Sequence, residues 1–130
     1  MCGIAGYVGD RESADVLVDA LSKLEYRGYD SAGIAVFDHG NIKVKKCKGR
    51  LANLVEKMDE EGKPQGHVGI GHTRWATHGE PSDINSHPHG NKRVTIVHNG
   101  IIENYKKLKD FLVGEGYSLS LIHISEPTRH

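Results

Sequence analysis

The sequence predicts a single layered domain of the α/β or α+β class, in which strand pairs alternate with helices. The chain has 130 residues, which is enough for one compact domain and too few for two of ordinary size. Short segments with strand-like alternation are interleaved with segments of helical apolar spacing. The 16 glycines gather with polar residues in short stretches, which indicates tight turns between short strands.

The first elements are predicted to be a strand, a helix and a hairpin. Gly3 to Val8 is a short apolar strand that begins almost at the chain end. From Ser13 to Glu25 the apolar residues follow the helical spacing. The segments Ser31 to Phe37 and Ile42 to Lys48 alternate on either side of the turn sequence Asp-His-Gly-Asn, which predicts a hairpin.

A short second helix is expected next, with Leu51, Leu54, Val55 and Met58 on one face. Glu60 to Gly66 is a polar connector.

The second half predicts two more strands, a long loop and a third helix. Val68 to His72 and Arg93 to His98 are the strands. Thr73 to Asn91 lies between them with almost no apolar periodicity, and a loop of that length in a compact domain is usually functional. Ile101 to Val113 predicts a helix. The apolar run in Leu119 to His130 stops at a proline and is an unassigned tail.

Composition argues against several classes of partner. Lys plus Arg and Asp plus Glu both total 17, so the chain lacks the basic surface of a nucleic-acid or membrane-surface binder. No apolar run is long enough to span a membrane, and no secretory signal is visible. The cysteines, Cys2 and Cys47, form no disulfide framework, so we expect a reduced, cytoplasmic protein.

Cys2 is a candidate nucleophile. Once Met1 is removed, this residue carries both a thiol and an α-amine whose ordinary pKa is about 7.7–8.0. The amine can activate the thiol of its own residue without a histidine partner. The alternative interpretation is a small residue entering the first strand, although the adjacent glycines permit close approach of a ligand.

His98-Asn99-Gly100 lies between a predicted strand and a predicted helix. Attack on an amide creates an oxyanion that needs preorganised donors, and the Asn99 side chain and the Gly100 backbone N–H are suitable. The alternative is an ordinary Asn-Gly turn.

The segment from Gly71 to Gly79 is the densest polar cluster. Arg74 has a planar fork suited to a carboxylate, such as that of an amino acid. Thr77 and His78 can add hydrogen bonds, and Trp75 can act as a lid. The alternative is a solvated loop with a packed tryptophan.

Four histidines, His72, His78, His87 and His89, raise the question of a metal. They lack a recognised ligand spacing, so unligated histidines are expected and neither a metal nor a cofactor is predicted. Cys47 lies in a lysine-rich strand and is expected to be structural.

Taken together, these segments closely resemble the glutaminase domain of the glutamine–fructose-6-phosphate aminotransferases, within the class II glutamine amidotransferases. The resemblance runs from Met1 to about Tyr117 and rests on five blocks, at residues 1–6, 24–33, 71–81, 85–89 and 97–104. It implies an α+β fold, the N-terminal-nucleophile αββα sandwich of antiparallel sheets, incomplete in this chain.

The resemblance also implies residue roles. Cys2 would form a γ-glutamyl thioester and release ammonia, with Asn99 and Gly100 as the oxyanion hole. The remaining roles would be binding of glutamine by Arg74, Thr77 and His78, lining of the pocket by Arg27 and Gly28, and gating by Trp75. His87 would lie nearby without a catalytic step.

The chain departs from the family's pattern near its end. The family has an aspartate after the Gly-Tyr pair that anchors the α-amino group of glutamine, and here residues 120–126 contain none; Glu126 is a weak substitute beside Pro127. Residues 1–118 are therefore expected to be the N-terminal part of a glutaminase domain and 119–130 a non-native tail, with the sugar-phosphate isomerase domain absent.

The function implied is hydrolysis of glutamine to supply ammonia for making glucosamine 6-phosphate from fructose 6-phosphate. Fructose 6-phosphate would bind only through the missing domain, and the full-length enzyme would be a homo-oligomer. The alternatives are an inactive fragment, a non-catalytic glutamine-binding module, and another class II amidotransferase.

Overall fold

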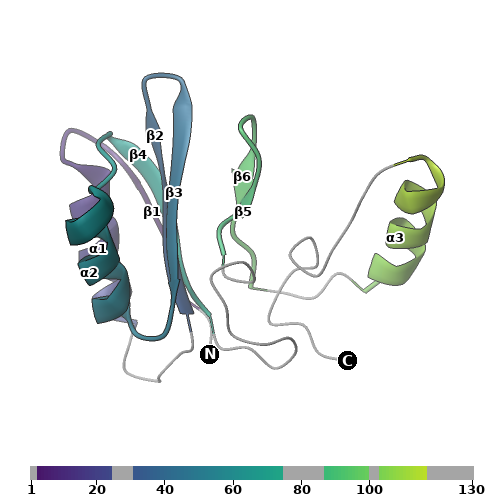
Figure 1. Ribbon diagram of the computed structural model, residues 1–130, viewed down its shortest axis with the longest axis horizontal. Coiled ribbons are helices and arrows are strands. Elements are labelled where there is room, and N and C mark those ends of the chain that lie inside the picture. Colours follow the sequence, from purple (N-terminus) through teal and green to yellow (C-terminus); the bar gives the residue numbers. More distant parts are fainter. Residues whose placement is uncertain (1–2, 25–30, 75–86, 100–102, 117–130) are drawn as a thin grey trace.

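The computed structural model describes residues 3–24, 31–74, 87–99 and 103–116. Its elements are β1 (Gly3–Val8), α1 (Ser13–Ser22), β2 (Ser31–Asp38), β3 (Asn41–Lys48), α2 (Leu51–Glu61), β4 (Val68–Arg74), β5 (His89–Gly90), β6 (Thr95–Ile96) and α3 (Tyr105–Gly114). Helices α1 and α2 cover one face of a four-stranded sheet, and the β5–β6 hairpin lies on its other side (Figure 1). The predicted α+β class is confirmed.

The four-stranded sheet is antiparallel throughout, in the order β1-β4-β2-β3. Its central strand β4 pairs with β1 in a register that joins Gly3 to Thr73, and with β2 in a register that joins Ser31 to Arg74. The first strand and the end of β4 therefore meet at one end of the sheet.

The hairpin between β2 and β3 is confirmed, and both strands reach the turn. His39 (φ 48°) and Gly40 (φ 88°) are left-handed. Two consecutive residues with positive φ are typical of a primed two-residue turn, whose twist matches that of the flanking strands. The hairpin could be predicted from the sequence because glycine and short polar residues are favoured in such turns.

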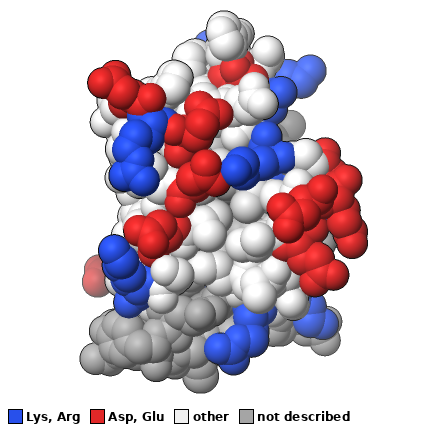
Figure 2. All heavy atoms as spheres, turned by 90° about the vertical axis from the view of Figure 1, so that its left-hand side faces the viewer, with Lys and Arg blue, Asp and Glu red and all other residues white. Residues whose placement is uncertain are grey.

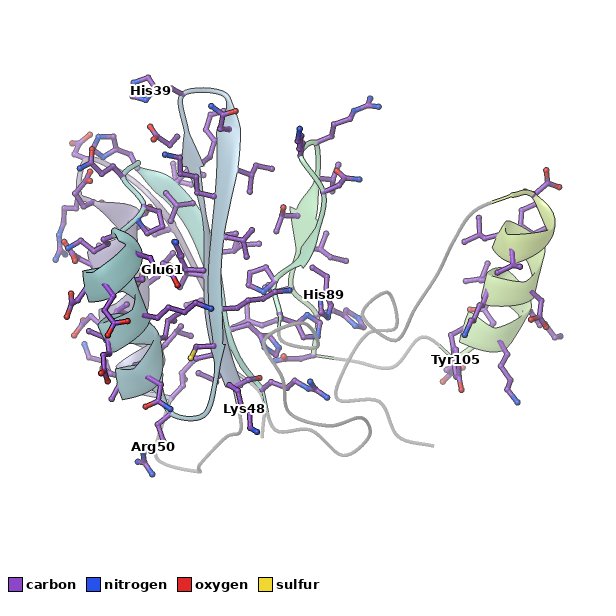
Figure 3. All side chains as sticks on the ribbon, viewed as in Figure 1. His39, Lys48, Arg50, Glu61, His89 and Tyr105 are labelled. Atoms are coloured by element: carbon purple, nitrogen blue, oxygen red, sulfur yellow. The ribbon has the colours of Figure 1, made fainter. Side chains whose placement is uncertain are left out.

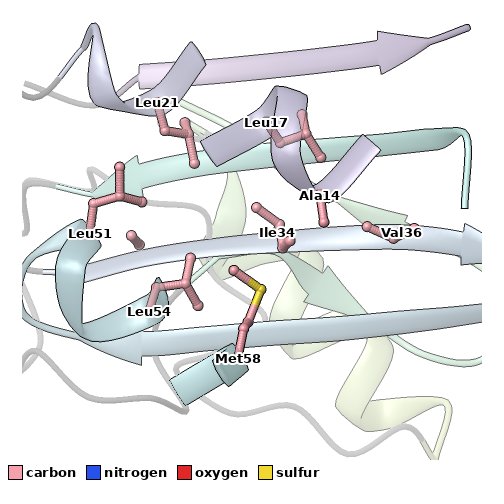
Figure 4. Close-up of a cluster of buried hydrophobic side chains, with 9 residues drawn as sticks. Ala14, Leu17, Leu21, Ile34, Val36, Leu51, Leu54 and Met58 are labelled. Atoms are coloured by element: carbon pink, nitrogen blue, oxygen red, sulfur yellow. The ribbon is translucent and has the colours of Figure 1, made fainter. Parts of the chain in front are cut away.

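The hydrophobic core lies between the two helices and the sheet (Figure 4). Its buried residues are Ala14, Leu17 and Leu21 of α1, Leu51, Leu54 and Met58 of α2, and Ala32, Ile34 and Val36 of β2. The helical faces predicted from the spacing are thus the buried ones, except that Val18, Leu24 and Val55 are only half-buried. Alternate residues of β2 supply the opposing surface, as expected for a strand.

The outer surface of the helix layer is charged, with both signs interspersed (Figure 2). Lys23 lies 3.4 Å from Asp19, and Lys63 lies 2.5 Å from Asp15, a contact that raises the pKa of Lys63. Such exposed pairs contribute little to stability, so the buried core dominates. Within the residues that the structure describes, no helix is long and apolar enough to cross a membrane.

On the opposite face, Gly33 allows the segment before β5 to approach the sheet closely. A Cβ added at Gly33 would collide with the main-chain oxygen of His87, and it would lie 2.9 Å from both Lys46 Cβ and Pro88 Cδ. The Lys46 ammonium also donates a hydrogen bond to the carbonyl of Pro88, at 3.1 Å. The lack of a side chain at Gly33 leaves room for this segment, and the hydrogen bond from Lys46 holds it against the sheet.

Several predicted boundaries were wrong; helix α1, for example, ends at Ser22 rather than at Glu25. The long loop from 73 to 91 begins with the last two residues of β4 and contains β5, because pairing with β2 extends β4 and pairing with β6 creates β5. The strand predicted from 93 to 98 shortens to Thr95–Ile96, since the partner β5 has only two residues. The third helix starts at Tyr105, after Asn104, a residue type that favours helix caps over helix interiors. The tail at 119–130 lies outside the described residues.

Because Leu54 is fully buried in the core, we expect its truncation to reduce the stability of the fold strongly. Leu54→Ala is expected to lower the free energy of unfolding by about 2–5 kcal/mol, through lost transfer energy and a residual cavity. Leu108→Ala, at a leucine that is 44% exposed, should cost clearly less. Urea unfolding followed by circular dichroism measures both changes, and equal losses would contradict the assigned core.

The close approach at Gly33 predicts that Gly33→Ala destabilises the fold by about 1–3 kcal/mol, because the added methyl group overpacks the space below His87. Gly6→Ala is the matched control on the same face of the sheet, since its added Cβ would meet only the Gly69 carbonyl, at 3.9 Å. Urea midpoints that shift by the same amount in both variants would show that Gly33 has no special packing role.

Candidate functional site

Of the residues expected in the active site, the structure describes Arg74 and Asn99. The others lie outside the described residues: Cys2, Arg27, Gly28, Trp75, Thr77, His78 and Gly100. The site is therefore built from the strand that ends at Arg74 and from the residues that contact it.

The end of β4 places His72 and Arg74 on the face opposite the core helices. A Cβ added at Gly71 would meet Leu21 and Ile34, so this position faces the core. Because side chains alternate along a strand, His72 and Arg74 both face the other way. Both are fully buried.

A buried guanidinium requires compensation from acceptors or negative charge. Arg74 is the last residue of β4, where the strand ladder stops. Its planar fork of donors can bind a carboxylate in two places at once, which a lysine cannot do. Arg74 thus has the chemistry and the placement expected of a carboxylate-binding residue.

Three histidines stack beside this strand end. The ring centroids of His72 and His87 are 4.3 Å apart, and those of His87 and His89 are also 4.3 Å apart. All three side chains are buried, and His89 lies at the base of the β5–β6 hairpin (Figure 3). Among the described residues, no group of three metal-ligating side chains is arranged to hold an ion.

Burial keeps His72 and His87 uncharged at neutral pH. Desolvation lowers the pKa of His72 to about 4, and the hydrogen bond to Asn99, with a smaller contribution from the main chain of His98, only partly opposes this. Desolvation also lowers the pKa of His87 to about 2, with the neighbouring His72 and His89 adding to the effect. A neutral imidazole has one donor and one acceptor nitrogen, so each ring can orient a partner.

His72 also contacts Asn99. Its Nε2 lies 2.7 Å from Oδ1 of Asn99, a hydrogen bond between residues 27 positions apart. The sequence indicated Asn99 but treated His72 only as a metal candidate. A usable signal was present, because Arg74 follows the predicted end of the strand at His72 by two residues and shares its face once the strand continues.

An apolar cleft of about 250 Å³ lies elsewhere on this face, lined by Ala35, Phe37, Ile42, Val68, Gly69, Ile70 and Thr95. Val68 is the first residue of β4 and Arg74 the last. Ile70 is the lining residue of β4 nearest to Arg74. At about 3.3 Å per residue it lies roughly 13 Å from Arg74 and roughly 7 Å from His72, so the cleft adjoins the polar cluster along β4.

The buried histidines predict that acid destabilises the fold. In the unfolded chain these two histidines titrate near the ordinary value of 6.5. Below that pH they bind protons in the unfolded chain that they do not bind in the folded one. The stability contributed by the neutral rings is present above pH 6.5 and is lost as the pH falls towards 4. Each histidine adds a slope that rises to about 1.4 kcal/mol per pH unit as the pH falls well below 6.5. Urea unfolding between pH 7 and 5 measures this slope.

The test variant is His87→Phe, which should reduce the slope relative to the wild-type chain. An unchanged slope in His87→Phe would refute the assignment.

Comparison with known proteins gives close relatives along most of the chain. The glutamine–fructose-6-phosphate aminotransferase of Clostridium tetani is 62% identical over 119 residues, which is 90% of this chain and 19% of the relative. The enzyme of the same description from Mesorhizobium japonicum is 52% identical over 130 residues, which is 100% of this chain and 21% of the relative. The chain thus spans about a fifth of the length of the curated relatives it matches. No family model matches the chain.

Solved structures agree with the sequence comparison. The glutamine phosphoribosylpyrophosphate amidotransferase of B. subtilis, complexed with ADP and GMP, superposes with a TM-score of 0.76 at 26% identity, covering 92% of this chain and 26% of that one. A structure described as the allosteric regulatory enzyme of purine biosynthesis has a TM-score of 0.80, with the same identity and coverage. The chain therefore belongs, by sequence and fold, to the glutamine amidotransferases of the N-terminal-nucleophile type, and corresponds to one part of the glutamine–fructose-6-phosphate aminotransferases.

Proposed function

We propose that this chain hydrolyses the side-chain amide of glutamine with Cys2 as the nucleophile. The observation that carries the proposal is the convergence of three segments at one end of the sheet. Gly3, the residue after Cys2, pairs with Thr73, which is adjacent to Arg74. Asn99 is bonded to His72 on the same strand. The segments that carry the proposed nucleophile, the carboxylate-binding arginine and the oxyanion donor thus all reach the end of β4.

The reaction begins when the α-amine of Cys2 takes the thiol proton and the sulfur attacks the amide carbon of glutamine. The resulting oxyanion accepts hydrogen bonds from the Asn99 amide and the Gly100 N–H. The C–N bond then breaks, the amine returns its proton to the leaving group, and ammonia departs from the γ-glutamyl thioester. Water attacks the thioester, the C–S bond breaks, and glutamate and the free thiol are produced.

The other residues bind and enclose the substrate. Arg74 pairs with the α-carboxylate of glutamine, and Thr77 and His78 add hydrogen bonds to its backbone groups. Trp75 closes over the bound amino acid and limits access of water to the intermediate. Arg27 and Gly28 line the pocket of the nucleophile.

In the whole protein, we propose that the ammonia converts fructose 6-phosphate into glucosamine 6-phosphate. The proposal is supported by relatives described as isomerizing glutamine–fructose-6-phosphate aminotransferases. The sugar phosphate and the contacts of a homo-oligomer belong to the remaining four-fifths of such a protein. The absence of a disulfide framework supports a cytoplasmic location.

The nucleophile is tested by comparing two cysteine variants of the Met1-processed chain. Cys2→Ala is expected to abolish glutamate release from glutamine, because no thioester can form. Cys47→Ala, at a half-buried position in β3, is expected to retain it. A coupled glutamate assay measures both.

Folding of each variant is verified by circular dichroism. A folded wild-type chain that releases no glutamate would favour a non-catalytic glutamine-binding module, and release by Cys2→Ala would exclude Cys2 as the nucleophile.

A further inference from the structure

We propose that His72 is a positioning residue that determines which end of the Asn99 side-chain amide faces the substrate. The inference rests on the proposed function, because it concerns the oxyanion hole of that reaction. It begins from the hydrogen bond between Nε2 of His72 and Oδ1 of Asn99, at 2.7 Å.

A side-chain amide has two ends of similar shape and opposite hydrogen-bonding character. Only the NH₂ end can stabilise an oxyanion, whereas the oxygen end would repel it. An Asn99 side chain that rotated by half a turn about its last bond would therefore oppose the reaction. The oxygen of Asn99 is held by His72, so the NH₂ end points to the other side.

The hydrogen of His72 must lie on Nε2 for this arrangement, because an amide oxygen only accepts. The other nitrogen of the ring supports this tautomer. Nδ1 of His72 is buried and has no hydrogen-bond partner among the described residues. A buried N–H without a partner is rarer than a buried acceptor without one, so the hydrogen belongs on Nε2.

His72 is a rigid support. It lies in β4, which is paired on both sides, and its ring packs against that of His87. Asn99, by contrast, is exposed and follows the two-residue strand β6. The hydrogen bond thus ties a weakly held segment to the central strand of the sheet, in the manner by which outer residues orient catalytic groups.

Two substitutions separate this role from simple packing. His72→Phe keeps a ring against His87 and removes the donor. His72→Gln places an amide N–H near the position of Nε2 and restores a donor. We expect His72→Phe to lower kcat for glutamine about 10- to 100-fold with KM changed less than about 3-fold, since one oxyanion donor is worth about 10²–10³ in kcat. We expect His72→Gln to recover most of the lost rate.

Alkylation by iodoacetamide provides a readout that does not use the oxyanion hole. The rate at which Cys2 is alkylated should be the same in wild type, His72→Phe and His72→Gln. Equal losses of kcat in both variants, or a His72→Phe variant with unchanged kcat, would overturn the proposal.

Nitrogen NMR tests the geometry without a measurement of activity. The His72 ring should show the neutral Nε2–H tautomer, and Asn99→Ala should shift its Nε2 resonance. An Nδ1–H tautomer would overturn the proposal. If the wild-type chain releases no glutamate but His72 has the expected tautomer, the proposed function fails and the orientation of Asn99 stands.

Discussion

Strand β4 is paired along its length with β1 on one side and β2 on the other, and this double pairing fixes the direction of every side chain it carries. Gly69 and Gly71 face the helices and leave room for Leu17 and Leu21. His72 and Arg74 face the opposite side. One strand therefore packs the core with its glycines and builds the site with its polar residues.

The strands on either side of β4 bring distant segments to the same place. Because β1 is antiparallel to β4, the start of the chain lies next to the end of β4. The same end receives the segment before β5, where Gly33 leaves space for the main chain of His87. An N-terminal nucleophile suits this topology, since a free α-amine can exist only at the chain start.

Much of the fold could be predicted from local signals. The helical spacing of Leu17, Leu21, Leu54 and Met58 identified the core, and the Asp-His-Gly-Asn turn identified the hairpin. Strand β5 could not be predicted and β6 was predicted too long, because two-residue strands exist only through their pairing with each other. The extension of β4 to Arg74 likewise depends on β2.

The sequence by itself determined the chemistry at the candidate site: a cysteine behind an N-terminal methionine, an arginine with a forked donor group, and an asparagine before a glycine. Those are properties of residue types in a local pattern. Only the tertiary structure decided that His72 and Asn99 meet, and that His72, His87 and His89 stack as buried rings. Contacts between residues far apart in the chain arise from strand pairing and burial, which no local pattern specifies.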